Sequence, residues 1–264
     1  MKKIIIAALA LLCAVNNAEA FNAFGHQTIA VLADTYLTDN AKKEFKAILK
    51  SDMAKASTWL NTLRKNPEMA HTKGWHYTTL AANGKSITMD ENDGVVVLEK
   101  AIAVFRNRAN ESDAAVQTAL RTVIHLVADL HSLSHIRIEG VDATKGFTYV
   151  TWNELTGKGS KNGKGSWFRL WESHFINRYT IFTPQYYADD IDIFARENKA
   201  EYEKGTPRFW VENGGEDVVR ALKHFNTGEP VPAQVTNRHE YNHTRCMAKA
   251  AYRLAYLLNS IFDE

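Results

Sequence analysis

The sequence predicts an all-α fold, built as one globular domain of seven or more helices. Apolar residues recur with helical spacing through most of the 264 residues. Capping residues stand directly before two of the clearest periodic segments. Neither an internal repeat nor a low-complexity block divides the chain. A chain of this length is long enough to bury one substantial core.

Helical periodicity marks seven segments in order along the chain. They are Gln27–Tyr36, Asp39–Leu49, Gly94–Asn107, Asp113–Leu130, Trp167–Tyr179, Pro184–Glu203 and Asn237–Phe262. Thr38 and Ser112 are expected to cap the second and fourth of these helices. Gly157–Gly165, rich in Gly, Lys and Ser, is expected to be a loop. Ile87–Met89 is a candidate for a short strand.

The first twenty residues have the pattern of an export signal. A basic start at Met1–Lys3 precedes an apolar run at Ile4–Val15, which is too short for a membrane-spanning helix. Ala18-Glu19-Ala20 then supplies a signal-peptidase site. We expect residues 1–20 to be removed and the mature domain, residues 21–264, to begin at Phe21. The protein is then periplasmic or secreted.

Cysteine content and charge limit the remaining possibilities. The mature chain keeps Cys246 alone, so it has no intrachain disulfide with which to stabilise an exported domain. A formal net charge of +2 does not indicate a general nucleic-acid binder, and any such binding must come from a local site. Ten histidines make a metal ion a candidate for the stabilising element.

The segment 125–135 contains an unusual set of polar residues. His125 and Asp129 are four residues apart and therefore share one face of an otherwise apolar helix. Burying them unpaired would cost several kcal/mol, and a divalent metal would remove that cost. His135 follows where the helix should end, whereas His131 points to the other side. A histidine–aspartate hydrogen bond in the core, or histidines exposed at the helix end, would also explain this pattern.

Three other short segments contain candidate ligands. Gly25-His26 lies five residues after the predicted mature start, and Trp75-His76-Tyr77 places a histidine between two aromatic rings. Trp171-Glu172 lies on a predicted helix beside the Gly-rich segment. Each segment alone is as compatible with core packing as with chemistry.

Together these segments follow, in order, the pattern of one family. The matching stretches are Phe-Asn-Ala-Phe-Gly-His-Gln-Thr-Ile-Ala at 21–30, Ser-Thr-Trp at 57–59, Trp-His-Tyr at 75–77, the spaced histidines and aspartate at 125–135, and Ala-Tyr-Arg-Leu-Ala-Tyr-Leu-Leu-Asn at 251–259. The chain resembles the zinc-dependent single-strand-specific nucleases of the mung bean nuclease type, which share their fold with zinc phospholipase C. The resemblance covers nearly the whole mature chain.

The resemblance implies a zinc cluster built partly on the mature N-terminus. Phe21, through its amine and carbonyl, His26 and Asp129 would hold one ion. A neighbouring ion would take His76, His125 and the bridging Asp129, with Asn61 as a fourth ligand. Nitrogen and carboxylate ligands suit zinc. A pair of ions ~3.5–4 Å apart would clamp both oxygens of a phosphodiester.

Two departures from the family pattern bear on activity. Asn61 stands where the family has an aspartate, so this ligand brings no charge and cannot accept a proton. The third ion normally uses His135 and a His-x-x-x-Asp pair, which here reads Phe168 and Glu172. We therefore expect two zinc ions and a third site that is weak or empty. His174 would face away from the site on a regular helix.

The resemblance also implies contacts to the substrate. Arg64 stands in the position of a phosphate-clamping arginine, and its planar fork suits a phosphate. Tyr77 would stack on a nucleobase, with a contribution of ~1–3 kcal/mol. Thr79 replaces an acidic residue that contacts the base edge, so base preference is expected to differ. Asp129, Asn61 and Arg64 are thus the predicted catalytic residues.

Three functional hypotheses follow. The first is an exported zinc-dependent endonuclease that hydrolyses single-stranded nucleic acid to 5′-phosphate products, with 3′-nucleotidase activity. The second is a metal-binding relative with weakened or lost catalysis, which binds nucleic acid or another phosphate ligand. The third is a phospholipase C-like phosphoesterase. All three are consistent with a monomer that has no stable membrane insertion and no implied protein partner.

Overall fold

The computed structural model describes residues 21–63, 66–86, 90–142, 146–153, 158–225 and 229–264. Its α-helices are α1 (Asn22–Thr35), α2 (Asp39–Leu49), α3 (Met53–Ser57), α4 (Trp59–Leu63), α5 (Gly94–Arg106), α6 (Asp113–Asp129), α7 (Trp167–Arg169), α8 (Phe175–Asn177), α9 (Pro184–Ala195), α10 (Lys199–Tyr202), α11 (Pro207–Phe225) and α12 (Ala233–Phe262). Short 3₁₀ and π turns join several of them, and the strands are β1 (Thr78–Leu80), β2 (Ile136–Ile138), β3 (Gly146–Asn153) and β4 (Lys158–Ser166). The predicted all-α fold class is confirmed.

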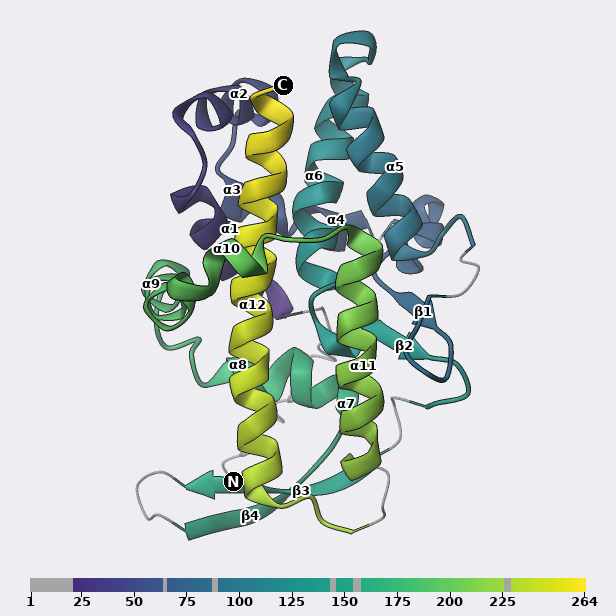
Figure 1. Ribbon diagram of the computed structural model, residues 1–264, viewed down its shortest axis with the longest axis vertical. Helices are drawn as coiled ribbons and strands as arrows, with labels where there is room; N and C mark the ends of the chain where they lie inside the picture. The colour runs from purple at the N-terminus through teal and green to yellow at the C-terminus, as the bar shows by residue number, and fades with distance from the viewer. Residues whose placement is uncertain (1–20, 64–65, 87–89, 143–145, 154–157, 226–228) are drawn as a thin grey trace, which may run out of the picture.

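The long C-terminal helix α12 organises the core (Figure 1). It packs against α1, α6 and α9, while α5 covers another side of α6. Small residues on α12, including Ala250, Ala251 and Ala255, are fully buried and let the neighbouring helices approach closely. The predicted helix over Asn237–Phe262 is correct but begins four residues earlier, at Ala233. Helices α1 and α6, which contain the candidate ligands, therefore lie directly against this central helix.

The two predicted helix caps are present. The Thr38 hydroxyl accepts a hydrogen bond from the Ala41 N–H at 3.1 Å, and α2 begins at Asp39 as predicted. The Ser112 hydroxyl accepts from the Ala115 N–H at 3.3 Å, and α6 begins at Asp113. Each cap satisfies a backbone donor that the first helical turn leaves without a partner. These two helix starts could therefore be located from sequence alone.

Helix α11 was not predicted, because Gly214-Gly215 interrupts its apolar periodicity. The structure shows the reason for these glycines. A Cβ on Gly214 would lie 2.4 Å from the Ile136 side chain, and a Cβ on Gly215 would lie 2.3 Å from Leu80. The glycines therefore allow α11 to pack tightly on the parallel β1–β2 pair. Tertiary packing offsets the low helix propensity of glycine here.

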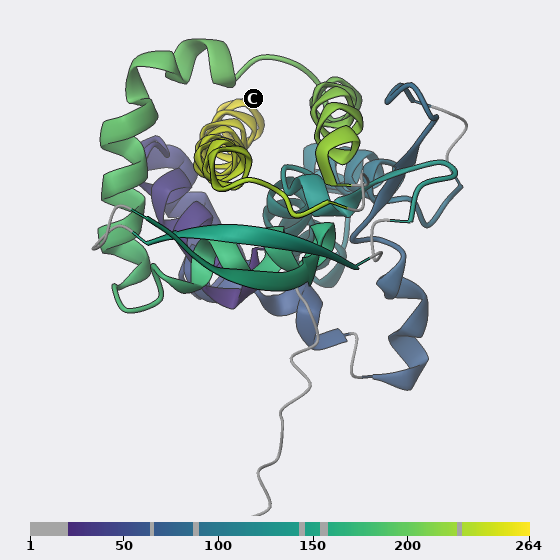
Figure 2. The same cartoon turned by 90° about the horizontal axis from the view of Figure 1, so that it is seen from below.

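The prediction that Gly157–Gly165 is a loop is wrong for its described residues. Lys158–Ser166 forms strand β4, which pairs antiparallel with β3. Strand β3 of this hairpin packs against the long helix α12, near the N-terminal end of that helix, at the lower end of Figure 1. Figure 2 shows the hairpin from below. Gly, Lys and Ser give no alternating apolar pattern, so this strand cannot be recognised from its own sequence. It forms because it pairs with β3. The candidate strand Ile87–Met89 lies outside the described residues.

Gly94 holds the segment that contains His76. Its N–H donates to the Tyr77 carbonyl at 2.7 Å, and a Cβ here would lie 2.4 Å from the Trp75 carbonyl oxygen. We expect Gly94→Ala to destabilise the fold by about 1–3 kcal/mol, because the backbone must shift. Thermal unfolding measures this effect. Gly146→Ala, whose Cβ would meet only an ordinary contact at 3.8 Å, should change stability much less; equal losses would contradict this role.

Candidate metal centre

Helix α6 places His125 and Asp129 side by side in the core, as their spacing predicts. Both side chains are fully buried, and His125 Nε2 lies 3.1 Å from Asp129 Oδ2. The other ring nitrogen, Nδ1, donates to the Ser57 carbonyl at 2.6 Å. This hydrogen bond orients the ring, so Nε2 is the nitrogen that faces Asp129. The segment of α3 that ends at Ser57 thus orients a candidate ligand through its backbone.

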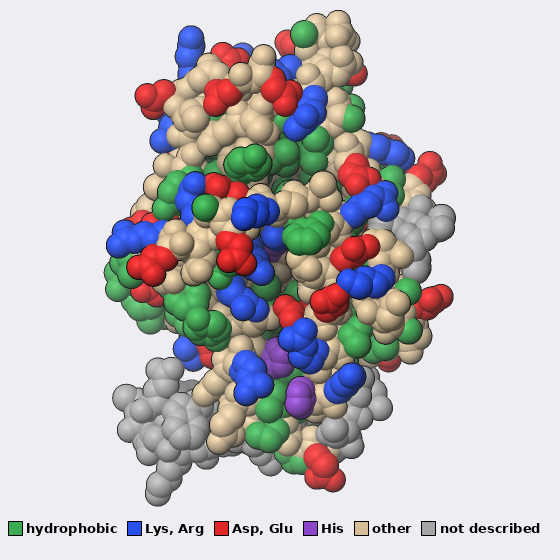
Figure 3. Space-filling model, in the orientation of Figure 1, with side chains coloured by type: hydrophobic (Ala, Val, Ile, Leu, Met, Phe, Trp, Pro, Cys, Tyr) green, Lys and Arg blue, Asp and Glu red, His purple; other side chains and the backbone are tan. Residues whose placement is uncertain are grey.

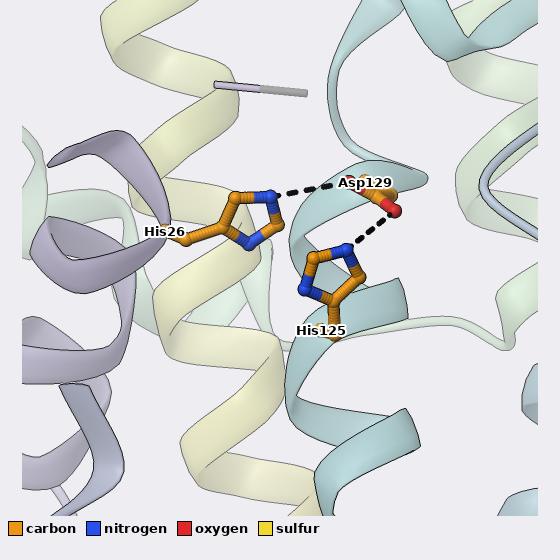
Figure 4. A group of neighbouring side chains, drawn as sticks. All are labelled: His26, His125 and Asp129. Carbon is orange, nitrogen blue, oxygen red and sulfur yellow. Dashed lines mark ion pairs between the residues drawn. The ribbon is translucent and has the colours of Figure 1, made fainter. Parts of the chain in front are cut away.

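Helix α1 brings His26 onto the same carboxylate (Figure 4). The His26 and His125 rings stack with centroids 4.2 Å apart and planes within 8°. His26 Nε2 lies 3.2 Å from Asp129 Oδ1, but the pair does not have hydrogen-bond geometry. Gly25 is required just before His26, because a Cβ there would lie 2.6 Å from the Phe21 Cβ.

His76 completes the group around Asp129. It lies in the short connection before β1, and its side chain is fully buried. His76 Nδ1 is 2.6 Å from Asp129 Oδ2 and 3.2 Å from His125 Nε2. Three histidines from three separate segments therefore meet at one carboxylate. The structure brings together the residues that the sequence pattern selected from positions far apart in the chain.

His135 and Glu172 form a second buried pair beside the first group. His135 Nδ1 donates to the His76 carbonyl at 2.5 Å, so its Nε2 is the available ligand atom, 3.5 Å from Glu172 Oε1. Glu172 lies in a π-helical turn, Leu170–His174, between α7 and α8. Such turns are frequent at functional sites because they redirect side chains. The Ser134 hydroxyl donates to Glu172 Oε1.

Several buried polar atoms of the predicted ligand residues have no hydrogen-bond partner. They are His26 Nδ1 and Nε2, Asn61 Nδ2 and Oδ1, Asp129 Oδ1, His135 Nε2 and Glu172 Oε2. Leaving such groups unsatisfied costs about 1–3 kcal/mol each. A divalent cation would satisfy the nitrogen and carboxylate lone pairs together. Ligand atoms of His26, His125 and Asp129 lie within 4.8 Å of one another, so this donor set fits zinc.

Burial and mutual charge shift the protonation of these residues. Burial, reinforced by the nearby His125, lowers the pKa of His26 to about 4, which favours the neutral ring that binds metals. Burial alone would raise the pKa of Asp129. The attraction of His125, His76 and His135 outweighs burial and holds the Asp129 pKa well below its usual value. A neutral His26 ring beside an ionised Asp129 carboxylate is therefore favoured.

Phe21 and Asn61, two further predicted ligands, are both buried. Phe21 is fully buried at the start of α1, with its backbone in the left-handed region at φ 49°. Its ring contacts His243 of α12 at 4.9 Å, and its carbonyl accepts from the Gly25 N–H at 2.9 Å. Asn61 is buried on α4, and neither atom of its amide is hydrogen-bonded. An amide in this state is consistent with a ligand position.

The structure describes two of the three predicted substrate-binding residues, Tyr77 and Thr79. Tyr77 is half-buried and stacks on His135 with centroids 4.4 Å apart. The guanidinium carbon of Arg137 lies 3.9 Å from the Tyr77 ring centroid, so His135 and Arg137 both pack on this ring. Thr79 is half-buried on β1, in register with Arg137 on β2. Arg64 lies outside the described residues.

Phe168 occupies the space beside His135 where the family pattern places a histidine. Its ring lies parallel to His135, with centroids 5.9 Å apart and planes within 14°. The phenyl ring has no donor atom for a metal, so the His135–Glu172 pair has no third side-chain ligand from this position. The weak or empty third site stays a prediction.

Two other histidines lie apart from the centre, as helix spacing predicts. His131 donates through Nδ1 to the Val127 carbonyl at 2.6 Å and accepts from Arg253 at 2.7 Å. His174 is exposed.

The sequence interpretation missed the roles of Ser57, Ser134 and Arg137. Ser57 acts through its carbonyl, for which side-chain chemistry gives no signal, and the other two are identified only by spatial proximity.

Comparison with protein-family models identifies the family of this chain. The family model S1/P1 Nuclease matches residues 21–263, nearly the entire described chain. The chain belongs to the S1/P1 nuclease family. A search of the curated proteins found no match. Membership in the S1/P1 nuclease family accounts for the helical architecture and gives the buried histidine cluster a functional context.

Proposed function

We propose that this S1/P1 family member is an exported zinc-dependent phosphodiesterase that cleaves single-stranded nucleic acid to 5′-phosphate products, with 3′-nucleotidase activity. The observation that carries the proposal is the convergence of His26, His76 and His125 on the buried Asp129 carboxylate. A cation would satisfy the lone pairs that lack partners here, and membership of a nuclease family supports a reaction that uses one.

The chain's residues have distinct roles in this proposal. His26, His76, His125 and Asp129 would hold two zinc ions, with Phe21 and Asn61 completing the set. Bound zinc supplies Lewis acidity, which polarises a phosphoryl oxygen and makes a coordinated water acidic near neutral pH. One oxygen of Asp129 faces His26, and the other faces His76 and His125. This carboxylate could therefore serve both proposed zinc ions. Asn61 cannot accept a proton. Among the described residues, Asp129 is the carboxylate nearest the histidines.

Substrate binding would use the surface next to His135. Tyr77 and Arg137 form a planar aromatic and cationic pair on this side of the cluster. Arg137 is exposed and can contact a phosphate or stack on a base. We propose that Arg137 acts together with the predicted phosphate clamp Arg64, and that Thr79 on the adjacent strand contributes to base preference.

Cleavage assays test this function directly. The mature protein with Zn²⁺ should cleave a single-stranded oligonucleotide and leave 5′-phosphate ends, whereas a phospholipid substrate run in parallel should remain intact. His125→Ala should lose the activity. Cleavage by wild type no faster than by His125→Ala would contradict the proposal, and preferential lipid hydrolysis would support a phospholipase-like function instead.

Asn61 supports a second candidate, a family member with weakened catalysis. Aspartate at this position would add a charged ligand next to the cluster. We expect Asn61→Asp to bind zinc roughly tenfold more tightly and to cleave faster, because a carboxylate adds negative charge to the ligand set, and hydrogen bonds to charged groups contribute about 1.5–3 kcal/mol against about 0.5–1.5 kcal/mol for neutral ones. Zinc titration and initial rates measure both effects. Thr62→Asp adds the same charge at the exposed neighbour and should change neither. If wild type already cleaves as fast as Asn61→Asp, the weakened-enzyme candidate fails.

Export and domain organisation remain proposals. Residues 1–20 lie outside the described residues, and the family match begins at Phe21, the residue expected to follow the cleavage site. We propose residues 1–20 as the signal peptide and residues 21–264 as the nuclease domain, which acts outside the cytoplasm as a monomer. Among the described helices, none is both long and apolar enough to span a membrane.

A further inference from the structure

A cationic cavity lies between α11 and α12, on the face shown in Figure 3. Its volume is about 300 Å³. The charged and polar residues that line it include Asp217, Arg220, His224, Arg238, Asn242 and Arg245. Within each helix these residues are three, four or seven positions apart, so each set occupies one helix face. The two faces point toward each other across the cavity, and Lys, Arg and His side chains gather over this part of the surface.

The cavity has more positive charge than its own carboxylate can neutralise. Asp217 is the only acidic residue among those that line it. This carboxylate is shared, at 3.7 Å from Arg220 Nη1 and 3.9 Å from Arg245 Nη2. Arg238 is exposed and forms no ion pair within the described part of the chain. Three guanidinium groups therefore face one carboxylate, and two positive charges remain in excess.

Part of this cavity is held in a fixed arrangement before any ligand binds. Arg245 donates through Nε and Nη2 to the Asn242 side-chain oxygen, at 3.1 and 2.6 Å. His239 lines the cavity at its inner side, with its ring against Trp167 and Phe225. Its buried Nδ1 has no hydrogen-bond partner. Burial, with the nearby His224 and Arg238, lowers the His239 pKa to about 4, so this ring is neutral near pH 7.

We propose that the cavity between α11 and α12 binds a phosphate group through Arg220, Arg238 and Arg245. The planar guanidinium fork matches the oxygens of a phosphate. The two excess charges match a phosphate dianion or two successive phosphodiesters, and a partly fixed arginine lowers the entropic cost of binding. The phosphate can be a free anion or belong to a nucleic-acid strand. The site is distinct from the His–Asp centre, and it does not depend on the catalytic proposal.

Ring NMR signals of His224 provide a local test with inorganic phosphate. In the zinc-loaded full domain, we expect these signals to shift saturably with phosphate. Arg220→Gln/Arg238→Gln should abolish the shift. Both side chains are exposed, so this variant should unfold at the wild-type temperature. Lys43→Gln/Lys46→Gln removes the same charge from exposed positions on α2 and should respond to phosphate as wild type does.

Fluorescence anisotropy with a cleavage-resistant phosphorothioate oligonucleotide tests whether the bound phosphate belongs to a nucleic-acid strand or is a free anion. If the strand uses the cavity, Arg220→Gln/Arg238→Gln should weaken binding roughly tenfold. The slope of log affinity against log salt should fall by about 1.4, because each lost contact to a single strand removes ~0.7. Loss of the phosphate response alone would assign the site to a free anion. Wild-type behaviour in both assays would overturn the proposal. Neither assay measures cleavage, so a failure here differs from a failure of the nuclease proposal.

Discussion

Asp129→Asn is expected to reduce oligonucleotide cleavage by about a thousandfold or more. The carboxylate lies 2.6 Å from His76, 3.1 Å from His125 and 3.2 Å from His26, so it is next to all three histidines that are proposed to hold zinc. Asparagine keeps the shape but removes the charge. A metal ion contributes several kcal/mol to such a reaction, and each 1.36 kcal/mol is tenfold in rate. Initial rates and zinc content measured on the same preparation test this expectation.

Asp192→Asn is the matched control for this variant. The Asp192 carboxylate accepts hydrogen bonds from the Tyr36 hydroxyl at 2.6 Å and the Tyr252 hydroxyl at 2.9 Å, away from the histidine cluster. Its substitution should lower the unfolding temperature but leave zinc content and the rate per folded molecule unchanged. Equal rate losses in the two variants would show that general destabilisation, and not metal binding by Asp129, explains the effect.

Removal of zinc is expected to lower the unfolding temperature by ~8–16 °C for each ion removed. A ligand present at a thousand times its Kd stabilises the folded state by about 4 kcal/mol per site, and 1 kcal/mol corresponds to ~2–4 °C in a domain of this size. The metal-free centre keeps buried polar atoms without partners, including Asp129 Oδ1 and His135 Nε2. Thermal unfolding with and without a chelator measures the difference.

Two controls make this stability measurement specific. Readdition of Zn²⁺ should restore the original unfolding temperature, whereas Mg²⁺ should not, because imidazole ligands suit zinc and magnesium prefers oxygen. Asp129→Asn should show little dependence on zinc. An unfolding temperature that is unchanged by the chelator in wild type would mean that the histidine cluster is satisfied without a metal ion.

Local signals predicted much of the helical fold. The starts of α2 and α6 could be located because Thr38 and Ser112 act within their own first turns. His125 and Asp129 were paired by helix spacing alone. The convergence of His26 and His76 on them could not be derived from periodicity, and resemblance to a family supplied it. The structure brings these residues together.

Other features depend on contacts between distant segments. Strand β4 lacks an alternating pattern and forms because β3 pairs with it. Helix α11 contains two adjacent glycines whose role is to let Leu80 and Ile136 approach. The stacking of Phe168 on His135 and the position of Arg137 over Tyr77 likewise follow from tertiary structure. No sequence window that covers one element contains this information.

The zinc content of the purified mature protein tests the central claim most directly. After dialysis against metal-free buffer, elemental analysis by mass spectrometry should find about two zinc ions per chain in wild type and a clear loss in Asp129→Asn. A wild-type value below one zinc ion per chain, even after incubation with excess Zn²⁺, would contradict the account. The three histidines around Asp129 would then be a structural hydrogen-bonded cluster.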